Sequence, residues 1–132
     1  RSREDGKFYF LETSSRVGGA HIPDLIEASS NINIWREWAK IEDAILKNKS
    51  YEVPKSTGFF AGLIIALIKD KEPDQHLFAC EEAVKFLPIE YHAGIVYKSS
   101  DEKMIEKRLD EAGEKIQNGL LSVIPPTDKP TS

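Results

Sequence analysis

The chain has 132 residues, of which 40% are hydrophobic and 30% are charged, and it carries a formal net charge of -4. The acidic balance argues against a nucleic acid as the main partner, the longest apolar run is too short to span a membrane, and the single cysteine, Cys80, excludes an intrachain disulfide. We therefore expect a cytoplasmic domain with one hydrophobic core or two small lobes.

The chain opens with a short strand pattern that leads into a polar loop. Aromatic and apolar residues at Phe8–Leu11 predict a buried strand, and Glu12 closes it. The polar run Thr13–Arg16 then leaves the sheet, and Gly18 and Gly19 would let a ligand approach the backbone closely. A carboxylate, an arginine and a glycine pair at the end of a strand indicate a site for an anionic ligand.

The side chains of this loop suit an anion together with a hard cation. Glu12 offers carboxylate oxygens to the cation, and Arg16 can hold a phosphate or carboxylate through two hydrogen bonds. His21 adds a proton or a hydrogen bond. In the alternative interpretation, Glu12 and Arg16 are solvated, the glycines form an ordinary turn, and His21 caps a helix that begins near Pro23.

The spacing Glu12-x-Ser14-x-Arg16, with His21 five residues beyond the arginine, resembles the last metal-binding strand of the ATP-grasp superfamily of carboxylate-amine and carboxylate-thiol ligases. Many members have Asn where this chain has Ser14, although some purine-pathway members also lack the Asn. The resemblance implies that Glu12 and Ser14 are ligands of Mg2+ bound to the phosphates of ATP. It also implies that Arg16 is the catalytic residue and contacts the acyl phosphate or the substrate carboxylate.

The order of the later elements resembles the carboxy-terminal part of biotin-carboxylase-like ATP-grasp enzymes, so the resemblance covers most of the chain. Those enzymes have Gln-Val-Glu-His where this chain has Gly18-Gly19-Ala20-His21, and Ala20 cannot act as the base that deprotonates bicarbonate. Biotin-carboxylase-like activity is therefore the disfavoured alternative. The loop is more similar to that of ligases that join an amino acid or another carboxylate to an amine, which implies that Gly18, Gly19 and His21 bind substrate.

The resemblance also implies a longer parent protein. An ATP-grasp site needs lysines and a hinge segment from an earlier lobe, and the segment Arg1–Lys7 leads at once into the first strand without an initial Met. We expect the fragment to be inactive alone. Its expected partners are the amino-terminal lobes of the parent protein and a small carboxylic or amino acid, and a homodimer is also possible. The alternatives are a non-catalytic domain of the same fold, for binding or oligomerisation, and an α+β interaction module whose loop matches by chance.

The next stretch predicts two helices in succession. Pro23 suits the first turn of a helix over residues 24–30, and Asn31 and Asn33 offer a stop and a new cap. The second helix has apolar residues at helical spacing, namely Ile34, Trp35, Trp38, Ile41, Ile45 and Leu46. We interpret this stripe as a core or domain-interface surface. In an alternative interpretation, its two tryptophans form a platform on which a base stacks.

The remaining sequence predicts an α+β lobe, so that the fold class is α+β with a mostly antiparallel sheet flanked by helices, the carboxy-terminal portion of an ATP-grasp fold. A polar segment with Pro54 separates residues 1–52, the end of the ATP-grasp domain, from a lobe over 53–124 and a flexible tail over 125–132. The elements expected in the lobe are a strand over 59–68 with a helix as the alternative, a turn over 69–74, strands over 76–80 and 92–97, a helix from a Ser99/Glu102 capping box to Asn118-Gly119, and a last strand over 120–124.

Overall fold

The computed structural model describes residues 5–7 and 17–121. The strand predicted at residues 8–11, the predicted ligands Glu12 and Ser14, the predicted catalytic residue Arg16 and the tail over 125–132 lie outside the described residues. The elements are α1 (Ile22–Ser30), α2 (Ile34–Leu46), β1 (Phe60–Leu67), a 3-10 helix (Gln75–Phe78), β2 (Ala83–Phe86), β3 (His92–Ser99), α3 (Glu102–Lys115) and a π-helical turn (Ile116–Leu120).

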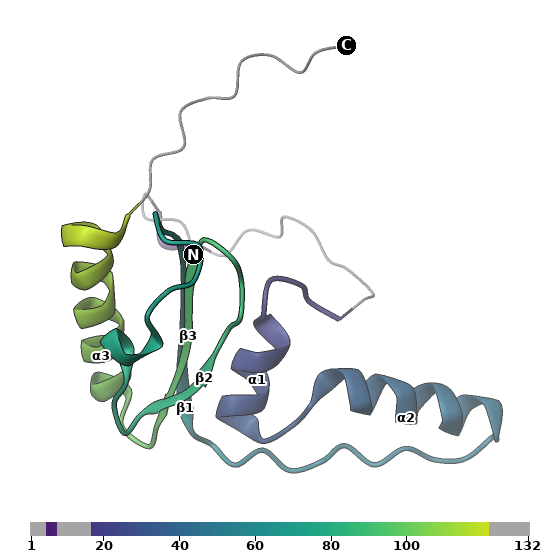
Figure 1. Ribbon diagram of the computed structural model, residues 1–132. Helices are drawn as coiled ribbons and strands as arrows, with labels where there is room; N and C mark the ends of the chain where they lie inside the picture. Colours follow the sequence, from purple (N-terminus) through teal and green to yellow (C-terminus); the bar gives the residue numbers. More distant parts are fainter. Residues whose placement is uncertain (1–4, 8–16, 122–132) are drawn as a thin grey trace.

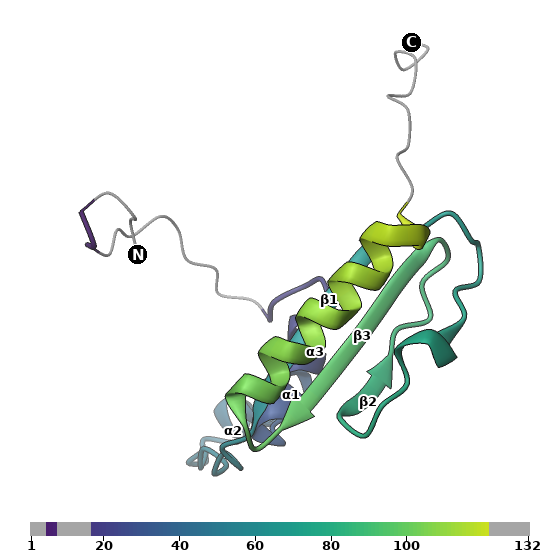
Figure 2. The ribbon, with the colours of Figure 1, turned by 90° about the vertical axis from the view of Figure 1, so that its left-hand side faces the viewer.

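The α+β class and the antiparallel sheet expected from the sequence are confirmed by the described residues, whereas the assignment to an ATP-grasp fold stays a prediction. The three strands lie in the order β1-β3-β2, and both pairs are antiparallel. Helix α3 covers one face of this sheet and α1 lies on the opposite face, while α2 extends away from the sheet (Figures 1 and 2).

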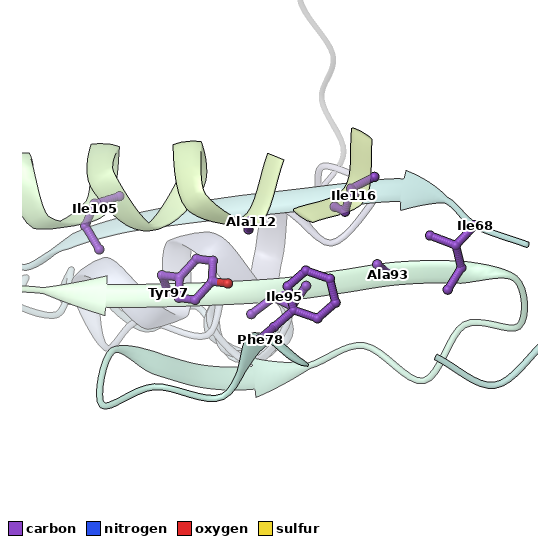
Figure 3. Close-up of a cluster of buried hydrophobic side chains, with 8 residues drawn as sticks. All are labelled: Ile68, Phe78, Ala93, Ile95, Tyr97, Ile105, Ala112 and Ile116. Carbon is purple, nitrogen blue, oxygen red and sulfur yellow. The ribbon is translucent and has the colours of Figure 1, made fainter. Parts of the chain in front are cut away.

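The main hydrophobic core lies between α3 and the sheet (Figure 3). Because side chains alternate along a strand, Ile95 and Tyr97 of β3 face this core, whereas the fully buried Val96 lines a hollow with residues of α1. The core cluster consists of Ile68, Phe78, Ala93, Ile95, Tyr97, Ile105, Ala112 and Ile116. The central strand is thus covered on both faces, and α1 is held against the sheet.

Local capping fixes both ends of the connection between α1 and α2 as the sequence predicts. Asn31 ends α1 in the left-handed conformation, and its N–H donates to the Glu27 carbonyl. The Asn33 side chain accepts from the N–H of Arg36 at the start of α2. The chain then returns without regular structure, and the N–H groups of Thr57 and Phe59 donate to carbonyls at the end of α1.

Two predictions about the second half are wrong. The segment from His76 forms a 3-10 helix instead of a strand, because the Asp74 carboxylate accepts from the His76 N–H and starts a tight turn. Helix α3 is capped by Asp101, which accepts from the Lys103 N–H, while Ser99 is the last residue of β3.

Within the part of the chain that the structure describes, no helix is long and apolar enough to cross a membrane. The sequence-based division at residues 52 and 53 stays a prediction.

Candidate functional site

An open hollow of about 300 Å³ lies between the loop that precedes α1 and the first turn of α2. Its lining brings together the three predicted substrate-binding residues that the structure describes, which are Gly18, Gly19 and His21. The other lining residues are Ala20, Pro23, Asp24, Glu27, Asn33 and Trp35. We call this feature the loop hollow.

The backbone that turns the chain into α1 has its unusual conformation at Ala20 and His21 and not at the glycine pair. Both residues are left-handed, with φ of 51° and 61°. The turn is closed by the Ile22 N–H, which donates to the Gly19 carbonyl at 3.1 Å. A Cβ at Gly19 would meet nothing within 4 Å, whereas one at Gly18 would lie 3.3 Å from Ile22 Cγ2. Gly19 therefore leaves open space beside the backbone.

His21 is held by a carboxylate of α1. Its Nδ1 lies 2.8 Å from Asp24 Oδ2, and Lys85 of β2 binds the other carboxylate oxygen. The Lys85 ammonium, reinforced by His21, lowers the pKa of Asp24 below its ordinary value against the opposing effect of burial. Although His21 occupies the N-cap position of α1, its side chain caps no backbone N–H. The histidine is thus oriented by Asp24 and does not act as the helix cap of the alternative interpretation.

A second carboxylate, Glu27, lies one helical turn further on the same side of α1. Asn33 Nδ2 donates to Glu27 Oε2 at 2.9 Å, while Asn33 Oδ1 caps α2. Among the described residues no Lys, Arg or His forms an ion pair with Glu27. The negative charge of Glu27 therefore faces the loop hollow without a cationic partner from the described part of the chain.

Trp35 forms the α2 side of the loop hollow. Its side chain is 53% exposed, and its ring stacks on that of Trp38 with centroids 5.8 Å apart and planes 16° apart. The Trp38 Nε1–H donates to Glu42, which fixes the second ring. No sequence motif connects Trp35, Glu27 or Asn33 with the glycine loop. The one available signal is the one-turn spacing of the histidine and the two acidic residues of α1, which puts Glu27 on the same side of the helix as His21.

The described residues alone do not form the predicted metal site. Residues 5–7 and 17–121 hold no group of three or more His, Cys, Asp or Glu side chains that could bind a metal ion. The Mg2+ assignment depends on Glu12 and Ser14, which lie outside this part of the chain.

The apolar stripe predicted on α2 is not part of the hydrophobic core. Helix α2 buries Glu37 and Ala44, with the Glu37 carboxylate held by Lys40 and the Tyr51 hydroxyl, both at 2.9 Å. The stripe, which we call the apolar face of α2, remains largely exposed, at 53% for Trp35, 37% for Ile41, 68% for Ile45 and 84% for Leu46. An exposed apolar face of this kind is typical of an interaction surface.

Other perturbed groups have structural explanations. Arg108 of α3 binds Glu82 and Glu111, each at 2.8 Å, and lowers the pKa of Glu82. Burial raises the pKa of Tyr97 to about 12. Cys80 is a partly exposed free thiol packed against the core. These residues lie away from the loop hollow, and we assign them to the stability of the fold.

No family model, curated protein or solved structure matches this chain. The likeness of the loop to ATP-grasp ligases consequently remains a basis for a proposal.

Proposed function

We propose that the chain is the carboxy-terminal part of an ATP-dependent ligase of the ATP-grasp type, which joins a carboxylate to an amine through an acyl phosphate. The observation that carries the proposal is the pattern Glu12-x-Ser14-x-Arg16 followed by Gly18-Gly19 and His21, directly before a helix. Gly18, Gly19 and His21 line one hollow, which supports a role for the loop in ligand binding.

In this proposal the loop binds and stabilises the reacting carboxylate. Arg16 stabilises the negative charge that develops on the carboxylate and phosphoryl oxygens, because a guanidinium makes paired charge-assisted hydrogen bonds to such groups. Gly19 leaves room for the substrate beside the backbone. With its Nδ1 turned to Asp24, His21 keeps Nε2 for a hydrogen bond to the substrate.

The nucleotide chemistry would come from MgATP, with Glu12 and Ser14 as the metal ligands in this chain. Amino-terminal lobes of the parent protein would supply the lysines that hold ATP, so residues 1–132 alone would not turn over ATP. We further propose that the enzyme works in the cytoplasm.

The test is ADP release by the full-length parent protein with MgATP, a panel of small carboxylic and amino acids, and amines. We expect Glu12→Gln and Arg16→Lys each to lower the rate by about 100-fold or more, the scale seen when one transition-state contact is removed. Glu106→Gln makes the same charge change on the exposed face of α3 and should leave the rate unchanged. Full activity of Glu12→Gln would overturn the proposal.

A second candidate, a non-catalytic domain that associates with another copy of itself, is favoured by the exposed apolar face of α2. In that case the chain would sediment as a dimer, and Ile45→Glu would give a monomer of unchanged stability. This candidate would replace the first if Glu12→Gln also left the activity of the parent intact.

A further inference from the structure

The two carboxylates that line the loop hollow differ in their partners. Asp24 is neutralised, because one of its oxygens binds Lys85 and the other faces His21. Glu27 lines this hollow and the neighbouring hollow bordered by Lys85, and the one hydrogen bond that its carboxylate makes among the described residues is from the neutral amide of Asn33 to Oε2, so Oε1 can accept from a ligand. A half-buried carboxylate in this position favours a ligand that brings a positive charge.

The aromatic side chain in the lining adds a second preference for a cation. The indole of Trp35 lines the same hollow as Glu27. An aromatic ring attracts an ammonium group through its negative face, and tryptophan does so best. Stacking on Trp38 holds the indole in place before a ligand binds, which reduces the entropy lost on binding.

The size of the hollow indicates how much of a ligand it can hold. Its volume of about 300 Å³ is at the small end of the range of ligand pockets, roughly 300 to 1,000 Å³. The space suits an amine with a short carbon skeleton, and it begins at Gly18, two residues after Arg16 in the sequence.

We propose that the loop hollow binds a small primary ammonium ion, with Glu27 as its counter-ion and the Trp35 indole as its aromatic wall. The ammonium N–H groups donate to Glu27 Oε1, and Asn33 keeps the carboxylate in position through Oε2. The identification of this cation with the amine substrate of the ligase rests on the proposed function, whereas the binding itself does not.

The test is titration of the chain with n-butylamine, with n-butanol as the neutral control of similar shape. Trp38→Phe retains an aromatic ring for stacking and leaves Trp35 as the single tryptophan, whose fluorescence reports binding. In this background we expect saturable quenching by the amine and none by the alcohol. Glu27→Gln, which can still accept from Asn33, should weaken binding about tenfold or more.

The matched control is Glu106→Gln, which removes the same charge from α3 and should bind as tightly as the unchanged chain. Trp35→Leu is a second variant, and its binding is measured by calorimetric titration. Its affinity for n-butylamine should also fall by about tenfold or more if the ring attracts the cation. Equal binding by Glu27→Gln and Glu106→Gln, or equal quenching by amine and alcohol, would overturn the inference.

The two proposals fail in different ways. If butylamine does not bind but the parent releases ADP in a manner that needs Glu12, the ligase proposal stands and the ammonium site is wrong. If butylamine binds through Glu27 but the parent releases no ADP, the ammonium site stands and the ligase proposal is wrong.

Discussion

Replacement of Gly62 by alanine tests how α3 is seated on the sheet. A Cβ at Gly62 would lie 2.7 Å from Ile105 Cγ2 and 2.9 Å from Leu109 Cδ1. Carbon atoms in contact prefer about 3.5 to 4.0 Å, so the helix must move outward by several tenths of an ångström or more. Ile105 is buried in the core, which leaves it little room to yield. We expect Gly62→Ala to lower the free energy of unfolding by about 1 to 3 kcal/mol.

Gly113 provides the matched control for this substitution. It lies in α3, and a Cβ there would meet nothing within 4 Å. Because alanine favours a helix over glycine by about 1 kcal/mol, Gly113→Ala should raise the free energy of unfolding by that amount. Urea unfolding followed by circular dichroism measures both changes. Gly62→Ala with unchanged stability would show that α3 does not pack on β1 as described.

Further predictions concern the loop hollow and the sheet face beneath α1. The folded-state pKa of Asp24 is below the ordinary 3.8, so its contribution to stability is present above pH 3.8 and is lost as the pH falls through the lower folded-state value. Asp24→Asn should therefore be less stable than the unchanged chain at pH 7 and equally stable well below pH 3.8, as measured by urea unfolding; a deficit independent of pH would contradict this. Gly19→Ala should leave the urea midpoint unchanged, because its Cβ enters open space, and a clear loss of stability would place Gly19 in a packed environment. Val96→Ala should cost about 2 kcal/mol because Val96 is 0% exposed, whereas Val84→Ala, at 51% exposed, should cost under about 0.5 kcal/mol; equal losses would contradict the burial of Val96 beneath α1.

Elements with local signals were predictable from the sequence. The start of α2 follows from Asn33, whose side chain caps the first turn, and α1 begins around Pro23 and ends at Asn31, as the residue types indicate. Strand β1 was identifiable from its continuous apolar run. These signals act within a few residues, so the sequence pattern contains them directly.

Features set by tertiary contacts were not predictable in the same way. Strand β2 has four residues and a register shift between Ala83 and Lys85, so it shows no regular alternation of apolar and polar side chains. The helical spacing of Trp35 and its neighbours indicated an amphipathic helix, but spacing cannot tell whether the apolar side is buried.

The candidate site also combines residues that a local motif predicts with residues that only the tertiary structure brings there. The loop motif identified Gly18, Gly19 and His21, and the structure places them around one hollow. Glu27 joins them along the same side of α1, whereas Trp35 joins them only through the turn between α1 and α2, which no short motif encodes.

The ligase proposal is tested most directly by following the substrate oxygen in the full-length parent protein. If the carboxylate attacks the γ-phosphate and the amine then displaces phosphate, one carboxylate oxygen leaves with that phosphate. With an 18O-labelled carboxylic acid, MgATP and an amine, we predict one 18O atom in each released phosphate, and loss of this product in Glu12→Gln. Release of unlabelled phosphate with ADP, or no release of ADP with any acid, would contradict the proposal.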